Sequence, residues 1–157
     1  HATNVAQRLY GSSLAMARGV TSAWVYNANG WIADPLKVGT ASAVGASVNS
    51  SVRVMNHSWI GSYGAGNENL DREAVRRLDY QMTRDGILAV CGENNGAGSV
   101  RHPLMGDCFN GLSVGRSDLQ HSAGDTSAQS DSPGRMKPDI IAPGAYTSFA
   151  KIGRAHV

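Results

Sequence analysis

Residues 71–96 have the sequence DREAVRRLDYQMTRDGILAVCGENNG, which decides the fold class. Apolar side chains recur in its first half at helical spacing, at Ala74, Val75, Leu78 and Met82. Asp71 is the expected N-cap of this helix, and Asp85–Gly86 is the expected stop. The run Ile87–Cys91 is continuously apolar and has strand length, which is typical of a strand buried on both faces. A helix that leads into such a strand predicts an α/β domain with a parallel sheet.

The rest of the chain continues the alternation of helices and strands. Helical spacing recurs in residues 3–16 and, weakly, in Gly39–Val48. Short apolar runs predict further strands at residues 22–26, 52–55, 112–115 and 140–142, whereas the polar residues 116–135 predict a surface loop. Ligands of parallel sheets bind beyond the carboxyl ends of the strands. Two polar clusters follow predicted strands in this way, Asn56–Ser58 and Glu93–Gly96.

The composition narrows the function classes. Charged residues make up 17% of the chain, below the ~25% usual in soluble domains, and the formal net charge is +2. Because Lys and Arg form no dense stripe, a nucleic-acid partner is not indicated. No apolar run approaches the roughly 18 residues that a membrane span needs. The Gly-rich patterns of phosphate-binding loops are missing between strand and helix, which argues against an unrelated nucleotide-binding domain.

Several polar side chains are expected to be structural. The two cysteines, Cys91 and Cys108, form one disulfide or stay free, and free buried thiols are favoured; their spacing indicates no metal site. His57 is expected to be structural as well. The charged residues between Asp71 and Arg77 predict a solvated helix face, with ion pairs worth only ~0.2–0.5 kcal/mol each.

Five segments carry patterns that belong together. In chain order they are His1–Ala6 (HATNVA), Val54–Trp59 (VMNHSW), Gly86–Gly96 (GILAVCGENNG), Lys137–Gly144 (KPDIIAPG) and Tyr146–Ala150 (YTSFA). In content and order they resemble the histidine, substrate-strand, oxyanion, K-P-D-I-x-A-P-G and serine motifs of the subtilisin-like serine proteases, the subtilase family. The resemblance covers nearly all of residues 1–150. It implies a three-layer α/β fold with a mostly parallel sheet flanked by helices, here incomplete.

The resemblance also implies a serine endopeptidase that hydrolyses peptide bonds through a seryl acyl-enzyme. Ser148 would be the nucleophile and His1 the general base, because an imidazole can take the hydroxyl proton near neutral pH. The Asn94 side chain and the Ser148 backbone N–H would bind the oxyanion. The segment that pairs with an extended peptide substrate would comprise Ser58, Trp59, Ile60 and Gly61. Within it, Trp59 is either a wall of the substrate pocket or part of the core.

Two departures from the family pattern favour an alternative function, a non-catalytic subtilase-like module for binding or assembly. Glu93 stands where the family usually has glycine, which puts a carboxylate beside a site for negative charge and leaves Asn95 as an alternative to Asn94. Tyr146 replaces the glycine that usually begins the serine motif, and the approach to Ser148 is shortened.

The two ends of the chain predict a fragment. The family's triad aspartate precedes the histidine, and this chain begins at His1. The fragment alone is therefore expected to be nearly inactive, since subtilisin loses a factor of roughly 3 × 10⁴ in kcat without its aspartate. The last residues resemble a translated sequencing adapter. We therefore expect a partial catalytic domain at residues 1–150 and a non-native tail at residues 151–157.

The family sets further expectations for cofactors, partners and location. No cofactor or metal takes part in the chemistry; structural calcium is frequent in the family, although no calcium loop is legible in this sequence. The partner is a peptide or protein substrate. Because the family is often exported, the expected location is the extracellular space or the cell envelope.

Overall fold

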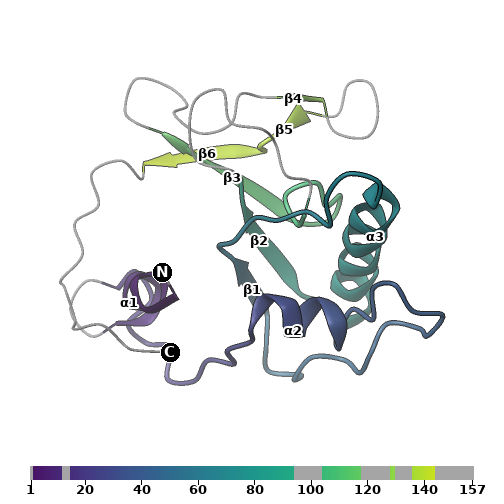
Figure 1. Cartoon of the computed structure of the whole chain (residues 1–157). Helices are drawn as coiled ribbons and strands as arrows, with labels where there is room; N and C mark the ends of the chain where they lie inside the picture. Colours follow the sequence, from purple (N-terminus) through teal and green to yellow (C-terminus); the bar gives the residue numbers. More distant parts are fainter. Residues whose placement is uncertain (1, 12–14, 94–103, 118–127, 130–135, 144–157) are drawn as a thin grey trace. The chain divides into compact units, whose positions relative to one another are not determined.

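The computed structural model describes residues 2–11, 15–93, 104–117, 128–129 and 136–143 (Figure 1). The chain divides into two compact units, one of His1–Val25 with Tyr146–Val157 and the other of Tyr26–Ala145. The first unit contains helix α1 (Ala2–Tyr10), which confirms the helix predicted within residues 3–16 but ends earlier. Residues 16 and 17 lie beside this helix, because the N–H groups of Met16 and Ala17 donate to carbonyls of α1.

The second unit contains a four-stranded parallel sheet (Figure 1). Its strands, in spatial order, are β1 (Val54–His57), β2 (Leu88–Gly92), β3 (Leu112–Ser117) and β6 (Ile140–Pro143). The expected α/β fold with a parallel sheet is therefore confirmed. A short antiparallel pair, β4 (Ala128–Gln129) with β5 (Met136–Lys137), is additional, and β4 lies in the segment predicted as a surface loop.

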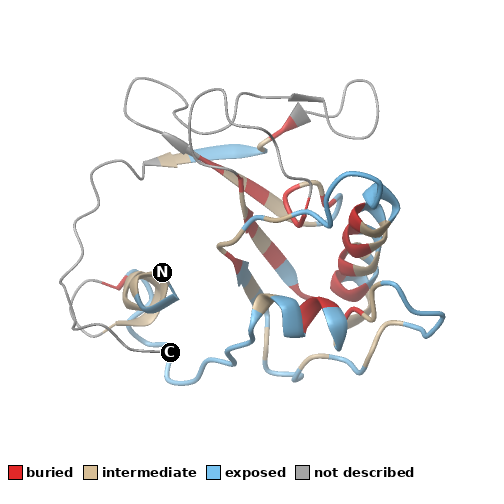
Figure 2. Cartoon of the chain, viewed as in Figure 1, coloured by how far each residue is buried: buried red, intermediate tan, exposed pale blue. Residues whose placement is uncertain are grey.

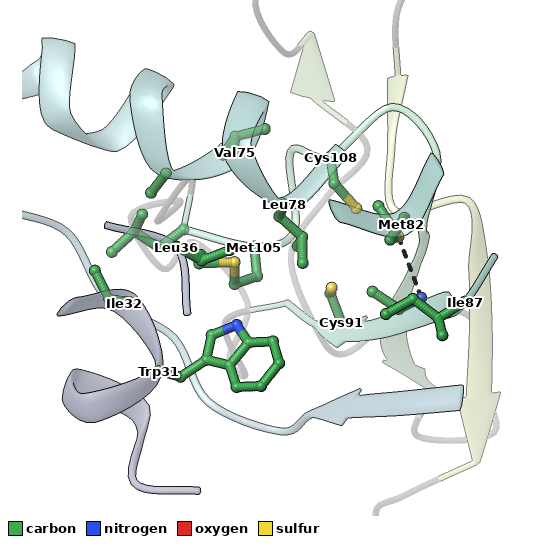
Figure 3. Close-up of a cluster of buried hydrophobic side chains, with 13 residues drawn as sticks. Trp31, Ile32, Leu36, Val75, Leu78, Met82, Ile87, Cys91, Met105 and Cys108 are labelled. Atoms are coloured by element: carbon green, nitrogen blue, oxygen red, sulfur yellow. Dashed lines mark hydrogen bonds between the residues drawn. The ribbon is translucent and has the colours of Figure 1, made fainter. Parts of the chain in front are cut away.

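Helix α3 (Glu68–Asp85) packs against one face of this sheet. The predicted apolar stripe is buried, and it meets Ala89 and Cys91 of β2 in a single cluster (Figure 3). Figure 2 shows the buried residues gathered where α3 faces the strands. Helix α2 (Ala28–Ala33) adds Trp31 and Ile32 to the same cluster. In the described part of this unit, the helices thus provide one layer over the sheet, on the face of Ala89 and Cys91.

The ends of α3 follow from local chemistry. The helix stops where predicted, because Gly86 adopts a left-handed conformation (φ 64°) that few other residues tolerate, and its N–H donates to the Met82 carbonyl. The expected N-terminus at Asp71 is wrong, since the helix begins at Glu68. Asp71 lies in the first turn, and its buried carboxylate accepts hydrogen bonds from Ser62 Oγ (3.0 Å) and the Tyr63 N–H (2.8 Å).

Two arginines of α3 hold the segment between α2 and β1. Arg77 donates to the carbonyls of Leu36 (3.0 Å), Thr40 (2.9 Å) and Ser42 (3.0 Å) and pairs with Glu73. Arg84 donates to the Gly45 carbonyl (2.8 Å). The helix expected weakly at Gly39–Val48 is therefore absent, because these carbonyls are engaged by side chains rather than by the N–H groups of a helix. The prediction of a solvated charged face is also wrong for Asp71 and Arg77.

Two further expectations differ from the structure. Residues 22–26 were expected to form a buried strand, but they are exposed and form no strand. An apolar run becomes a strand only when another strand pairs with it and a neighbouring element covers it. Conversely, the sequence analysis missed α2, a six-residue helix with Asn27 as its N-cap; the Asn27 side chain accepts from the N–H groups of Asn29 and Gly30.

We predict that Arg77→Ala destabilises the protein by about 2–3 kcal/mol, because three carbonyls lose a charged donor. Urea unfolding measured by fluorescence would give the free energy of unfolding. Arg76→Ala is the matched control, since Arg76 is exposed on the same helix, and its effect should stay within ~0.5 kcal/mol. Equal effects of the two substitutions would contradict a structural role for Arg77.

Candidate functional site

The carboxyl ends of the parallel strands lie together at one edge of the sheet. His57 ends β1 and stands opposite Cys91, one residue before the end of β2 at Gly92. A Cβ atom built on Gly92 would lie 3.7 Å from the His57 carbonyl and 3.9 Å from the Ser58 Cα, so the two strand ends are in van der Waals contact. This is the edge where ligands of parallel sheets bind.

The three predicted catalytic residues, His1, Asn94 and Ser148, lie outside the described residues. Their predicted roles are therefore not tested by the geometry. Two of them follow described strands in the sequence. Asn94 comes directly after Glu93 at the end of β2, and Ser148 comes shortly after the end of β6.

The predicted substrate-binding residues are described, and three of them line one surface hollow. Trp59, Ile60 and Gly61 lie along a hollow of about 420 Å³. The remaining lining residues come from α2, through Ala28, Asn29, Ile32 and Ala33, and from Val38, Ser62, Tyr63 and Leu104. The hollow is large enough for an apolar side chain of a peptide. Trp59, for which pocket wall and core were both open, contributes to the hollow and also packs against the core cluster.

Ser58, the first residue of the predicted segment, does not line this hollow. Its hydroxyl donates to the Asn56 carboxamide oxygen (3.1 Å) and accepts from the Asn56 amide nitrogen (2.9 Å). The two side chains thus lie on the same face at the end of β1. The hydrogen bonds fix the backbone where the chain leaves the sheet and enters the Trp59–Gly61 segment.

Four aromatic rings, the last of them Trp59 of the hollow, form a continuous edge-to-face row. The row runs from Tyr26 to Trp31 (4.9 Å between centroids), then to His57 (5.9 Å) and Trp59 (5.9 Å). His57 is buried, and its Nε2 atom has no hydrogen-bond partner among the described residues. Burial lowers the pKa of His57 from 6.5 to about 4, so the ring is neutral near pH 7. The structural role expected for His57 fits this position between two tryptophans.

The chain that follows Gly61 is anchored to α3. Asp71 accepts from Ser62 and Tyr63, the residues that follow the predicted substrate segment directly. A carboxylate in the first turn of a helix is also stabilised by the helix dipole. The aromatic row therefore holds Trp59 in the lining of the hollow, and the Asp71 carboxylate holds Ser62 and Tyr63 there.

Glu93 is buried beside the predicted oxyanion residue, with only 4% of its surface exposed. Its backbone N–H donates to the Val114 carbonyl (3.2 Å), which continues the ladder between β2 and β3. Its carboxylate lies against the backbone of Gly106, where an added Cβ would be 2.5 Å from Oε1. The departure noticed in the sequence is thus accommodated by a glycine in another segment.

The sequence analysis missed the walls that come from other segments. Leu104 and the residues of α2 are distant in sequence from Trp59, and no motif marks them. The Asn27 N-cap was the one local signal that a helix begins beside the hollow.

The described residues contain no group of three or more His, Cys, Asp or Glu side chains that could hold a metal ion. A structural calcium site therefore stays an expectation from the family. Among the described residues, no helix is both long and apolar enough to cross a membrane.

Comparison with known families matches residues 1–156 to the subtilase family. No curated protein and no solved structure gives a significant match. The matched range includes all five motif segments. It also extends beyond residue 150, so it does not separate the predicted tail from the domain, and that boundary stays a prediction.

We predict that His57 makes the protein less stable in mild acid. Below pH 6.5 the unfolded chain binds a proton at His57, whereas the folded chain does so only near pH 4. The free energy of unfolding should therefore fall as the pH decreases through this window, by about 3 kcal/mol in total. His57→Phe keeps an aromatic ring and should remove this slope in urea titrations between pH 7 and pH 5.

Asp85 also has a shifted pKa, but it does not contribute to the slope between pH 7 and pH 5. The hydrogen bond from Arg84 lowers the pKa of Asp85 from 3.8 to about 2. Its stabilising effect is present above pH 3.8 and is lost only below that value. A slope between pH 7 and pH 5 that is unchanged in His57→Phe would disprove the assignment to His57.

Proposed function

The chain belongs to the subtilase family of serine peptidases, and we propose that the protein is an endopeptidase that cleaves peptide bonds through a seryl acyl-enzyme. The family match carries the proposal, because it spans His1, Asn94 and Ser148 together with the segments around them. The partner is then a peptide or protein substrate. No described residue is required to bind a cofactor for this chemistry.

The proposed mechanism assigns one role to each residue. Ser148 Oγ attacks the scissile carbonyl while His1 accepts its proton and later gives that proton to the leaving amine. The Asn94 side chain and the Ser148 backbone N–H donate to the oxyanion that develops on the carbonyl oxygen. The acyl-enzyme is then hydrolysed by water, with His1 again as the general base. In subtilisin, the loss of one oxyanion donor costs about 10²–10³ in kcat.

The topology of the described strands supports this arrangement. β2 and β6 are both parallel to β3 and therefore end at the same edge of the sheet. The chain continues from these two ends toward Asn94 and Ser148. Two segments that are distant in sequence therefore begin at one edge of the sheet, which supports the proposed mechanism.

The hollow beside the Trp59–Gly61 segment supports the proposed mode of substrate binding. An extended peptide would pair through its main chain with the backbone after β1, and one of its side chains would enter the hollow. Apart from polar groups of Asn29, Ser62 and Tyr63, the walls are mainly apolar. We therefore propose that a large apolar side chain on the acyl side of the cleaved bond is preferred.

A fluorophosphonate probe tests the nucleophile. We predict that the full-length protein becomes labelled on Ser148, and that Ser148→Ala abolishes both labelling and peptide hydrolysis. Mass spectrometry of the labelled peptide identifies the modified residue. Ser122→Ala is a suitable control, because this serine lies outside the predicted motifs and its loss should leave labelling unchanged.

The buried Glu93 favours a second candidate, a non-catalytic binding module. A carboxylate next to the oxyanion site would oppose the charge that develops in the transition state. A well-folded full-length protein that is neither labelled nor hydrolyses peptides would reject the peptidase and favour this module. Label on a serine other than Ser148 would reject only the assignment of the nucleophile.

A second prediction concerns the hollow. Trp59→Ala should lower kcat/KM for peptides with a large apolar residue on the acyl side by roughly tenfold, with a smaller effect on peptides with glycine there. Trp24→Ala is the matched control, because Trp24 is an exposed tryptophan in the other unit. A uniform loss for all peptides would show that Trp59 supports the fold without setting specificity.

A further inference from the structure

Two fully buried thiols meet between β2 and the segment before β3. Cys91 lies on β2, and Cys108 lies in the turn formed by residues 104–111, which we call the 104–111 turn; neither side chain is exposed to solvent. Both thiols are free in the structure, as the sequence analysis favoured. Figure 3 shows the two sulfur atoms turned toward each other.

The position of Cys108 is set by contacts of the two residues that follow it. The carboxylate of Asp79 on α3 accepts from the N–H groups of Phe109 (2.8 Å) and Asn110 (2.8 Å). The Asn110 side chain returns to α3 through the Asp79 carbonyl (3.2 Å) and Thr83 Oγ (3.0 Å). The 104–111 turn is therefore fixed on α3, the helix that also packs against Cys91.

A glycine makes the close approach to β2 feasible. A Cβ atom on Gly111 would lie 2.6 Å from the Cys108 sulfur and 2.9 Å from the Ala89 carbonyl oxygen. Gly106 has the same function two residues before Cys108, where it leaves room for the Glu93 carboxylate. The turn thus lies along alternate residues of β2 and its continuation, with Gly111 at Ala89, Cys108 at Cys91 and Gly106 at Glu93.

We propose that Cys91 and Cys108 are a redox pair that forms an intramolecular disulfide when the protein folds in the presence of a disulfide oxidant. The bond would close the chain from residue 91 to residue 108, the segment that contains the predicted oxyanion residue Asn94. This inference does not depend on the proposed peptidase activity, because it stands on the packing of the turn against β2.

The reaction balances with a small-molecule disulfide as the oxidant, for example oxidised glutathione. One cysteine thiolate, for example that of Cys108, attacks one sulfur of the oxidant, forms a mixed disulfide and releases one small thiolate. Cys91 then loses its proton and attacks the Cys108 sulfur, which expels the second small thiolate. Two protein thiols are oxidised, and one small disulfide is reduced to two thiols.

Both thiols are inaccessible in the folded chain, so the exchange takes place before the 104–111 turn closes on β2. Either thiol can therefore form the mixed disulfide first, since the contacts of the folded chain are not yet made.

The test is to refold the full-length protein in a mixture of reduced and oxidised glutathione and then alkylate it in denaturant. We expect no alkylation of Cys91 or Cys108 without prior reduction, and a proteolytic peptide pair joined through these two residues in mass spectrometry. Two alkylated thiols, stable glutathione adducts or disulfides between chains would each overturn the proposal.

Thermal unfolding with and without a reductant gives the second measurement. A disulfide that closes this segment should raise Tm by about 10 °C over the reduced protein. The variants Cys91→Ala, Cys108→Ala and the double variant should show no reductant dependence. A wild-type Tm that is equal in both conditions would overturn the proposal, even if a variant fails to fold. Because neither measurement uses peptide hydrolysis, both remain interpretable for a protein without activity.

Discussion

The packing of α3 against one face of β2 is the interaction on which the other positions depend. Parallel strands are stable only when helices cover them, and here the apolar stripe of α3 buries Ala89 and Cys91. The connection between helix and strand is short, since the Met82 carbonyl accepts from the N–H groups of both Gly86 and Ile87. This tight connection reverses the chain and thereby decides at which edge of the sheet β2 ends. The positions of Glu93 and of everything that follows it depend on this reversal.

The edge of the sheet at which the strands end carries buried polar side chains as well as exposed ones. His57 ends β1 and Glu93 follows β2 directly, and both side chains are buried. Polar residues are expected at the carboxyl edge of a parallel sheet that carries a site. Buried polar groups are not confined to this edge, because Asp71 and Gln81 of α3 are buried as well.

The sequence predicts those features that depend on neighbouring residues in the chain. The helix before β2, its stop at Gly86 and the buried run of β2 follow from periodicity and from one glycine. The segment Gly39–Val48 could not be predicted, because Arg77 and Arg84 hold it from a helix that comes much later in the chain. Contacts between distant segments also explain why only part of the candidate site could be predicted from the sequence.

Within that site, Trp59, Ile60 and Gly61 are found from a motif, whereas the walls from α2 and Leu104 exist only after folding. Residues 22–26 show the opposite error, since they have the composition of a strand but no strand pairs with them among the described residues. Composition alone predicts what a segment could become. Tertiary contacts decide what it does become.

The 104–111 turn connects the three parts of the candidate site. Leu104 lines the hollow, Gly106 lies against Glu93, and Cys108 lies against Cys91. At its other end, Asn110 is bonded to α3. Because protein interiors are close-packed, a shift of this turn would move the hollow wall and the end of β2 together. The absence of a side chain at Gly111 is therefore a specific requirement of the site, since an added Cβ would meet the backbone of Ala89 and push the turn away from β2, whereas at Gly106 an added Cβ would displace only the Glu93 carboxylate.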